Sequence, residues 1–200
     1  LYEIGFLFII IGIIAYSLPR ITEDTWPCGN EGIASHGVAT TAANYTERCN
    51  SNTNNVFCIT RPHGMTLLIV LSYLILGVSA FAAKITVVLV NITTIIFLYL
   101  FAKTYWDKRV ALFSCFFTAF SPMFFFMRNF LTSEVLAPLF IFAILYTYVK
   151  YLKTRERKYF LLIFFVSGLG MFFGDWPVYF IVSSIIVHHF VFIKKSRRNN

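Results

Sequence analysis

Apolar segments separated by short polar or charged segments follow one another along the whole chain. A helix that crosses the hydrocarbon core of a bilayer needs about 20 largely apolar residues, with a usual range of about 17 to 25. Segments near this length recur, and the middle of each carries almost no charge. The pattern predicts an all-α integral membrane protein. The apolar segments are residues 4–18, 65–78, 82–102, 110–127, 132–149, 159–173 and 177–193.

Composition supports a membrane location and argues against a nucleic-acid interpretation of the net charge. Only 13% of the residues are charged, against about 25% in an average soluble domain, and the mean hydropathy is +0.72. The net charge of +8 comes from short basic clusters between apolar segments. Nucleic-acid binding requires a solvated basic face instead, so we expect no nucleic-acid partner.

The distribution of basic residues predicts the topology, because Lys and Arg are enriched in cytoplasmic loops. If residues 65–78 lie in the outer interface, the segments 103–109, 150–158 and 194–198 all face the cytoplasm. If residues 65–78 span the bilayer instead, the basic segment 150–158 moves to the outer face, against this rule. The first arrangement is therefore preferred. The basic residues that it leaves outside are Arg20, Arg48, Arg61, Lys84 and Arg128.

This topology predicts a single transmembrane domain over residues 1–200. It has about six transmembrane helices, both termini of the segment in the cytoplasm, a long outer loop at 19–64 that carries surface helices, and an interfacial helix at 65–78. The chain begins with Leu1 and ends in a basic, polar tail. We expect it to be a fragment or N-terminal module of a longer protein.

Three outer segments each bring an acidic residue to the same predicted face. Glu31 lies between Gly29 and Gly32, which allow a close backbone approach. Glu134 opens a predicted span, and Asp175 lies in the turn Gly-Asp-Trp-Pro. Each has a structural interpretation as well: a solvated loop acid, an acid at a helix N-terminus or a turn-forming Asp. Because acids at a membrane are costly and usually functional, all three are candidate site residues.

Basic and imidazole side chains share this outer face. Arg61 and Arg128 are candidates for binding phosphate, because a guanidinium group matches phosphate oxygens with two parallel hydrogen bonds. The alternative is that each neutralises a nearby acid or a lipid headgroup. No tight ligand spacing predicts a metal, although carboxylate oxygens would favour Mg or Mn over zinc. A metal site on this face would draw on Glu31, His36, His63 and Glu134.

Three of the four cysteines, Cys28, Cys49 and Cys58, lie in the predicted outer loop. One disulfide and one remaining thiol fit an oxidising compartment, and the pairing stays open. Cys115 lies inside a predicted span. The sequence Asn-Tyr-Thr at 44–46 is a glycosylation sequon on the outer side.

The order of these elements resembles the N-terminal half of GT-C-fold glycosyltransferases that use polyprenyl-phosphate-linked sugars. The nearest group is that of the dolichyl-phosphate-mannose protein mannosyltransferases and their aminoarabinose transferase relatives. An acid-containing loop follows the first span, and the resemblance covers nearly the whole chain through short motifs. These motifs are RPHG (61–64), SPMFFFMRNFLTSEVLAPLF (121–140), KYLKTRERKYFLL (150–162) and GLGMFFGDWPVYF (168–180).

The resemblance implies an activity and assigns roles by position. The first-loop acid of this family activates the acceptor; Asn30-Glu31 stands where the mannosyltransferases usually have Asp-Glu, so this role passes to Glu31. Glu134 matches the second-loop acid and Arg128 the basic residue before it, while His63 replaces a proline of the family turn. Arg61, Arg128 and His63 would hold the donor. His36 and Asp175 are additional candidates.

The implied function is transfer of a sugar from a polyprenyl-phosphate donor to a protein or lipid acceptor on the outer or lumenal face of the plasma membrane or endoplasmic reticulum. Cofactors are limited to Mg or Mn, if a metal is used at all. The alternative is a non-catalytic polytopic subunit of GT-C-like fold that binds a partner or lipid. We also expect the protein to contact membrane lipid and other membrane subunits.

Overall fold

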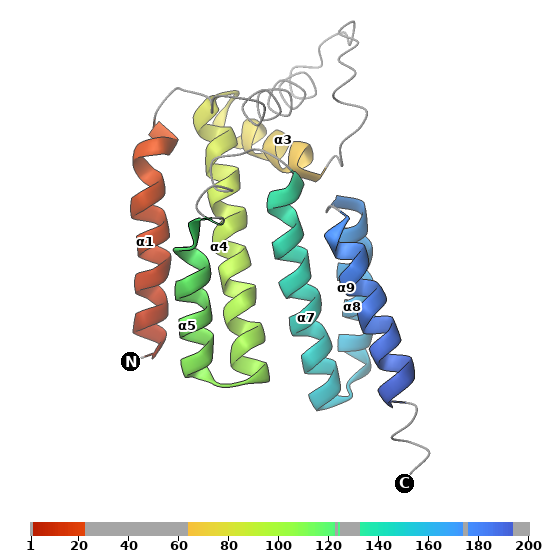
Figure 1. Cartoon of the computed structure of the whole chain (residues 1–200). Helices are drawn as coiled ribbons and strands as arrows, with labels where there is room; N and C mark the ends of the chain where they lie inside the picture. The colour runs from red at the N-terminus through yellow and green to blue at the C-terminus, as the bar shows by residue number, and fades with distance from the viewer. Residues whose placement is uncertain (1, 23–63, 123, 125–132, 174–175, 194–200) are drawn as a thin grey trace, which may run out of the picture.

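The computed structural model describes residues 2–22, 64–122, 124, 133–173 and 176–193, and within them all regular structure is helical. Six helices run alongside one another, and α3 lies across one end of them (Figure 1). α4 and α7 are central: α4 packs against α1, α3, α5 and α7, and α7 also packs against α8 and α9. The helices are α1 (Tyr2–Thr22), α3 (Gly64–Leu76), α4 (Ala80–Tyr105), α5 (Lys108–Ala119), α7 (Leu136–Thr154), α8 (Arg157–Phe173) and α9 (Pro177–His188).

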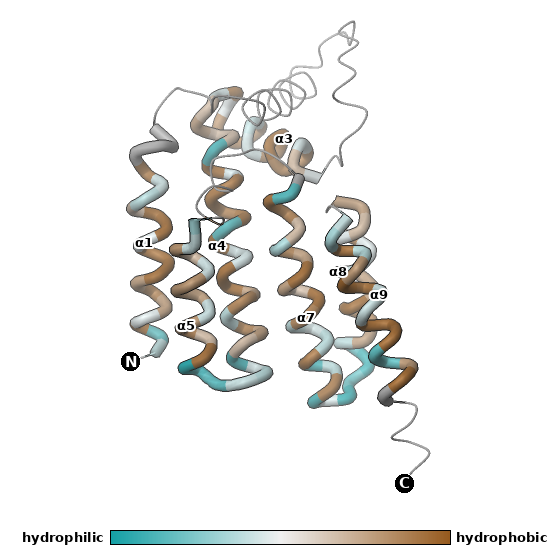
Figure 2. Tube along the Cα trace, in the orientation of Figure 1, coloured by the Kyte–Doolittle hydropathy of each residue, from teal (hydrophilic) through white to brown (hydrophobic). Residues whose placement is uncertain are grey.

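The helices agree with the predicted apolar segments, and two of them are long and apolar enough to cross a membrane. These are α4, with 26 residues, and α7, with 19. Hydrophilic residues gather at the α4–α5 and α7–α8 connections, which lie at the end of the bundle opposite α3 (Figure 2). α3 lies across the other helices, and its place in the membrane interface stays a prediction. The count of six spans and the side that faces the cytoplasm remain predictions.

One predicted boundary is wrong. Residues 110–127 were expected to form a single span, but α5 ends at Ala119 and the helical backbone resumes at Pro122. Ser121 Oγ accepts a hydrogen bond from the backbone N–H of Phe124 at 3.2 Å. A Ser N-cap followed by Pro at the first helical position is a helix-start signature, so the chain begins a new helix there.

Three groups of buried side chains hold the bundle together. One joins α1, α4 and α5, a second joins α3, α4 and the start of α7, and a third joins α7, α8 and α9. Cys115 is fully buried in the first group, as predicted for a residue inside a span. Ser72 on α3 and Thr86 on α4 share a hydrogen bond of 2.5 Å, which adds a polar tie between α3 and the bundle.

The packing around α4 can be tested by replacing Asn91, a buried polar residue of this helix. It is 2% exposed, and its Nδ2 has no hydrogen-bond partner among the residues that the structure describes. A buried donor without a partner costs about 1 to 3 kcal/mol, so Asn91→Leu should leave the melting temperature in detergent unchanged or raise it. As a control, Ile95→Ala empties a fully buried position on the same helix and should cost about 2 to 5 kcal/mol. A clear loss of stability in Asn91→Leu would show that this amide has a partner in the membrane.

Candidate functional site

Glu134 is the one predicted site residue that lies within the described part of the chain. It sits in the single 3-10 turn Ser133–Val135, which leads directly into α7. Its side chain is half-buried, whereas the next two residues, Val135 and Leu136, are almost completely buried. Glu134 therefore lies just before the N-terminus of a core helix, where the helix dipole stabilises negative charge.

The other predicted site residues lie outside the described residues. They are Glu31, His36, Arg61, His63, Arg128 and Asp175, and the same is true of Cys28, Cys49 and Cys58. Two of the described helices, however, begin or end beside them in the chain. α3 starts at Gly64, directly after His63, and α8 ends at Phe173, two residues before Asp175.

Gly64 lies close against the backbone of Phe173. A Cβ atom added to Gly64 would lie 2.4 Å from the carbonyl oxygen of Phe173 and 2.8 Å from its Cα. These are backbone atoms that no change of rotamer can move away, so only glycine fits here. The last residue of the RPHG motif is therefore what allows the N-terminus of α3 to rest on the C-terminal end of α8.

The start of α7 belongs to the same region as the N-terminus of α3. Met65, the residue after Gly64, is buried in the same core group as Val135 and Leu136. Three segments far apart in the sequence therefore meet at the N-terminus of α3: the end of RPHG, the turn that carries Glu134, and the end of α8. We name this region the α3 junction. It lies at the end of the bundle opposite the α4–α5 and α7–α8 connections (Figure 1).

Sequence reasoning placed RPHG, Glu134 and the Gly-Asp-Trp-Pro turn on one face, and the described neighbours of all three do meet. It missed the contacts that bring them together. The Gly64–Phe173 approach and the Ser72–Thr86 hydrogen bond join residues remote in sequence, and a single sequence holds no signal for either. The glycine of RPHG was the available hint, since a glycine that starts a helix suggests a close approach.

No group of three or more His, Cys, Asp or Glu side chains that could hold a metal occurs among the described residues. His188 lies far from the α3 junction along the bundle, at the C-terminal end of α9, where its Nδ1 is 2.6 Å from the hydroxyl of Tyr148 on α7. It therefore ties α9 to α7 at the opposite end of the bundle.

Comparison with known protein families yields a match. The family model described as dolichyl-phosphate-mannose-protein mannosyltransferase matches residues 60–200. The matched region includes RPHG, Glu134 and the Gly-Asp-Trp-Pro turn, and it begins after Glu31. No curated protein and no solved structure gives a significant match.

Proposed function

Because the chain belongs to the dolichyl-phosphate-mannose-protein mannosyltransferase family, we propose that it transfers a sugar from a polyprenyl-phosphate donor to a protein or lipid acceptor on the outer or lumenal face of a membrane. The observation that carries the proposal is the family match over residues 60–200, which covers all three segments of the α3 junction. The donor and acceptor are part of the proposal.

The α3 junction has the physical character that such a reaction needs. The lipid-linked donor must reach the site from the bilayer, while the acceptor arrives from water. The junction lies at the end of a bundle with apolar outer surfaces, and a half-buried carboxylate stands at its edge. A site at the boundary between lipid and water can receive both substrates without moving either across the membrane.

In the proposed reaction, Glu31 removes the proton from the acceptor, whose oxygen or nitrogen attacks the anomeric carbon. The bond from that carbon to the phosphate oxygen breaks, the polyprenyl phosphate leaves, and the anomeric configuration inverts. Arg128 or Arg61, with His63, would bind the phosphate, because cationic groups stabilise the charge that develops on the leaving oxygen. Glu134 is the second acid of the site, and it would orient the acceptor or serve as base in place of Glu31.

The test is sugar transfer in membranes that contain the full-length gene product. Donors carrying labelled mannose or another labelled sugar on a polyprenyl phosphate are supplied with a peptide or lipid acceptor. We expect labelled acceptor to form with the protein present and not in membranes lacking it. If folded protein transfers no sugar from any donor to either acceptor, the result would favour a non-catalytic membrane subunit over an enzyme.

A further inference from the structure

A second feature lies on the opposite side of the bundle from α8 and α9, between α1 and α5. A cavity of about 450 Å³ opens there, and its lining is almost entirely apolar. The two helices run in the same direction in Figure 1, and small residues let them approach: a Cβ added to Gly5 would lie 3.2 Å from Leu112. The lining residues are Gly5, Phe8, Ile9, Leu112, Phe113, Phe116 and Phe120.

The length of the cavity suits an acyl chain within one leaflet. On α5 its lining runs from Leu112 to Phe120, which is about 12 Å along the helix at 1.5 Å per residue. Half of the hydrocarbon core of a bilayer is about 15 Å thick. The apolar lining therefore covers most of the depth of one leaflet, which suits a phospholipid chain better than a polyprenyl chain of many isoprene units.

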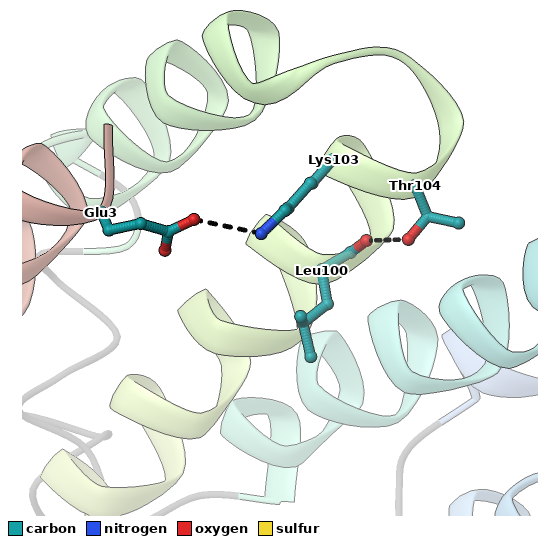
Figure 3. Close-up of polar contacts among 4 residues, drawn as sticks. All are labelled: Glu3, Leu100, Lys103 and Thr104. Atoms are coloured by element: carbon teal, nitrogen blue, oxygen red, sulfur yellow. Dashed lines mark hydrogen bonds and ion pairs between the residues drawn. The ribbon is translucent and has the colours of Figure 1, made fainter. Parts of the chain in front are cut away.

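Polar groups cluster beyond the Gly5 and Leu112 end of this cavity, at the start of α1 and of α5. Arg109 Nε donates a hydrogen bond of 2.9 Å to the hydroxyl of Tyr2, and Lys103 forms an ion pair of 3.1 Å with Glu3 (Figure 3). Lys108 acts electrostatically on the same Glu3 carboxylate. We name Lys103, Lys108 and Arg109 the basic cluster.

The acids near the basic cluster are already used within the protein. Glu3 pairs with Lys103, and Asp107 accepts the backbone N–H of Val110 at 2.8 Å as the N-cap of α5. Lys108 and Arg109 are exposed, and Arg109 donates through Nε to Tyr2. A guanidinium group has five N–H donors, so Arg109 keeps further donors that suit an anionic group.

Aromatic residues place this cluster at the depth of lipid headgroups. Tyr105 is the last residue of α4 and Trp106 follows it in the α4–α5 connection, and both are more than half exposed. Tyr and Trp concentrate at the membrane–water interface. A lipid whose chain fills the α1–α5 cavity would therefore present its phosphate at the level of Lys108 and Arg109.

From this geometry we infer a second lipid site: an anionic phospholipid binds in the leaflet at the α4–α5 end, with an acyl chain between α1 and α5 and its headgroup phosphate on Lys108 and Arg109. Basic residues near a membrane surface bind anionic lipids in this manner. The site lies at the opposite end of the bundle from the α3 junction, and it requires only that the bundle span a bilayer. It is therefore independent of the proposed sugar transfer.

The test counts lipids bound to the full-length, delipidated protein by native mass spectrometry, with added phosphatidylglycerol or phosphatidylcholine. We expect preferential retention of phosphatidylglycerol. Each basic residue near an anionic surface adds roughly fivefold in affinity, so Lys108→Gln with Arg109→Gln should weaken phosphatidylglycerol binding by roughly 30-fold. The charge-matched control, Arg157→Gln with Lys158→Gln at the start of α8, should bind like the wild type.

A second pair of variants tests the chain-binding part without touching the charges. Phe113→Ala with Phe116→Ala should also weaken phosphatidylglycerol binding, whereas Phe164→Ala with Phe165→Ala, equally exposed on α8, should not. Folding is checked in each variant by its melting temperature, and the Phe113/Phe116 pair decides the question if the charge variant is unstable. Equal retention of both lipids, equal loss in both charge variants, or preferential binding of polyprenyl phosphate at this site would overturn the inference.

Discussion

Glu31→Gln is expected to lower sugar transfer by about 100- to 10,000-fold, the usual contribution of a general base. The amide keeps the size of the side chain and removes its ability to accept the acceptor's proton. The measurement is the initial rate of labelled-sugar transfer in membranes, normalised to the amount of folded protein. Donor binding should change little, because the phosphate is assigned to Arg61, Arg128 and His63.

The matched control is Glu47→Gln, which removes an acid from the same predicted outer loop. It should transfer sugar at the wild-type rate. Glu134→Gln should reduce the rate as well. If Glu31→Gln is fully active while Glu134→Gln is not, the base is Glu134 and the role assigned to Glu31 by resemblance is wrong.

Gly64→Ala is expected to destabilise the protein by about 1 to 3 kcal/mol, the usual cost of forcing one extra methyl group into a tight contact. The added Cβ would lie 2.4 Å from the carbonyl oxygen of Phe173, so α3 or α8 must shift. Transfer should fall further than stability alone accounts for, because a misplacement of about 1 Å at a catalytic site can cost about 100-fold in rate. The melting temperature and the transfer rate of folded protein measure the two effects separately.

Gly168→Ala provides the comparison within α8. A Cβ at Gly168 meets nothing within 4 Å, and alanine favours a helix by up to about 1 kcal/mol over glycine. This variant should be as stable as the wild type, or slightly more so, and fully active. If Gly64→Ala behaves in the same way, the close approach of α3 to α8 does not shape the site.

The positions of the helices could be predicted because apolar segments bounded by charge carry a strong local signal. α4 and α7 follow the predicted segments within a few residues. The break at Ser121-Pro122 was missed because the apolar residues on both sides continue through it, and only the cap signature marks the boundary. Hydropathy over a long window cannot resolve a cap that depends on two residues.

The candidate site could also be predicted from the sequence only where the signal is local. Glu134 could be placed at the start of a helix from its local sequence, and the structure confirms that position. The approach of Gly64 to Phe173, and the burial of Met65 and Val135 in one core group, depend on how α3 crosses the bundle. That crossing is set by packing between distant segments, which a single sequence does not record.

The most direct test of the central claim is photo-crosslinking of the full-length protein with a polyprenyl-phosphate-sugar analogue that carries a diazirine next to the phosphate. Labelled peptides are mapped by mass spectrometry, with an excess of unmodified donor as competitor. We expect labelling at the α3 junction, in peptides that contain Gly64, Glu134 or Phe173, and we expect excess unmodified donor to suppress it. Labelling confined to the α4–α5 or α7–α8 connections, or labelling that the natural donor does not displace, would contradict it.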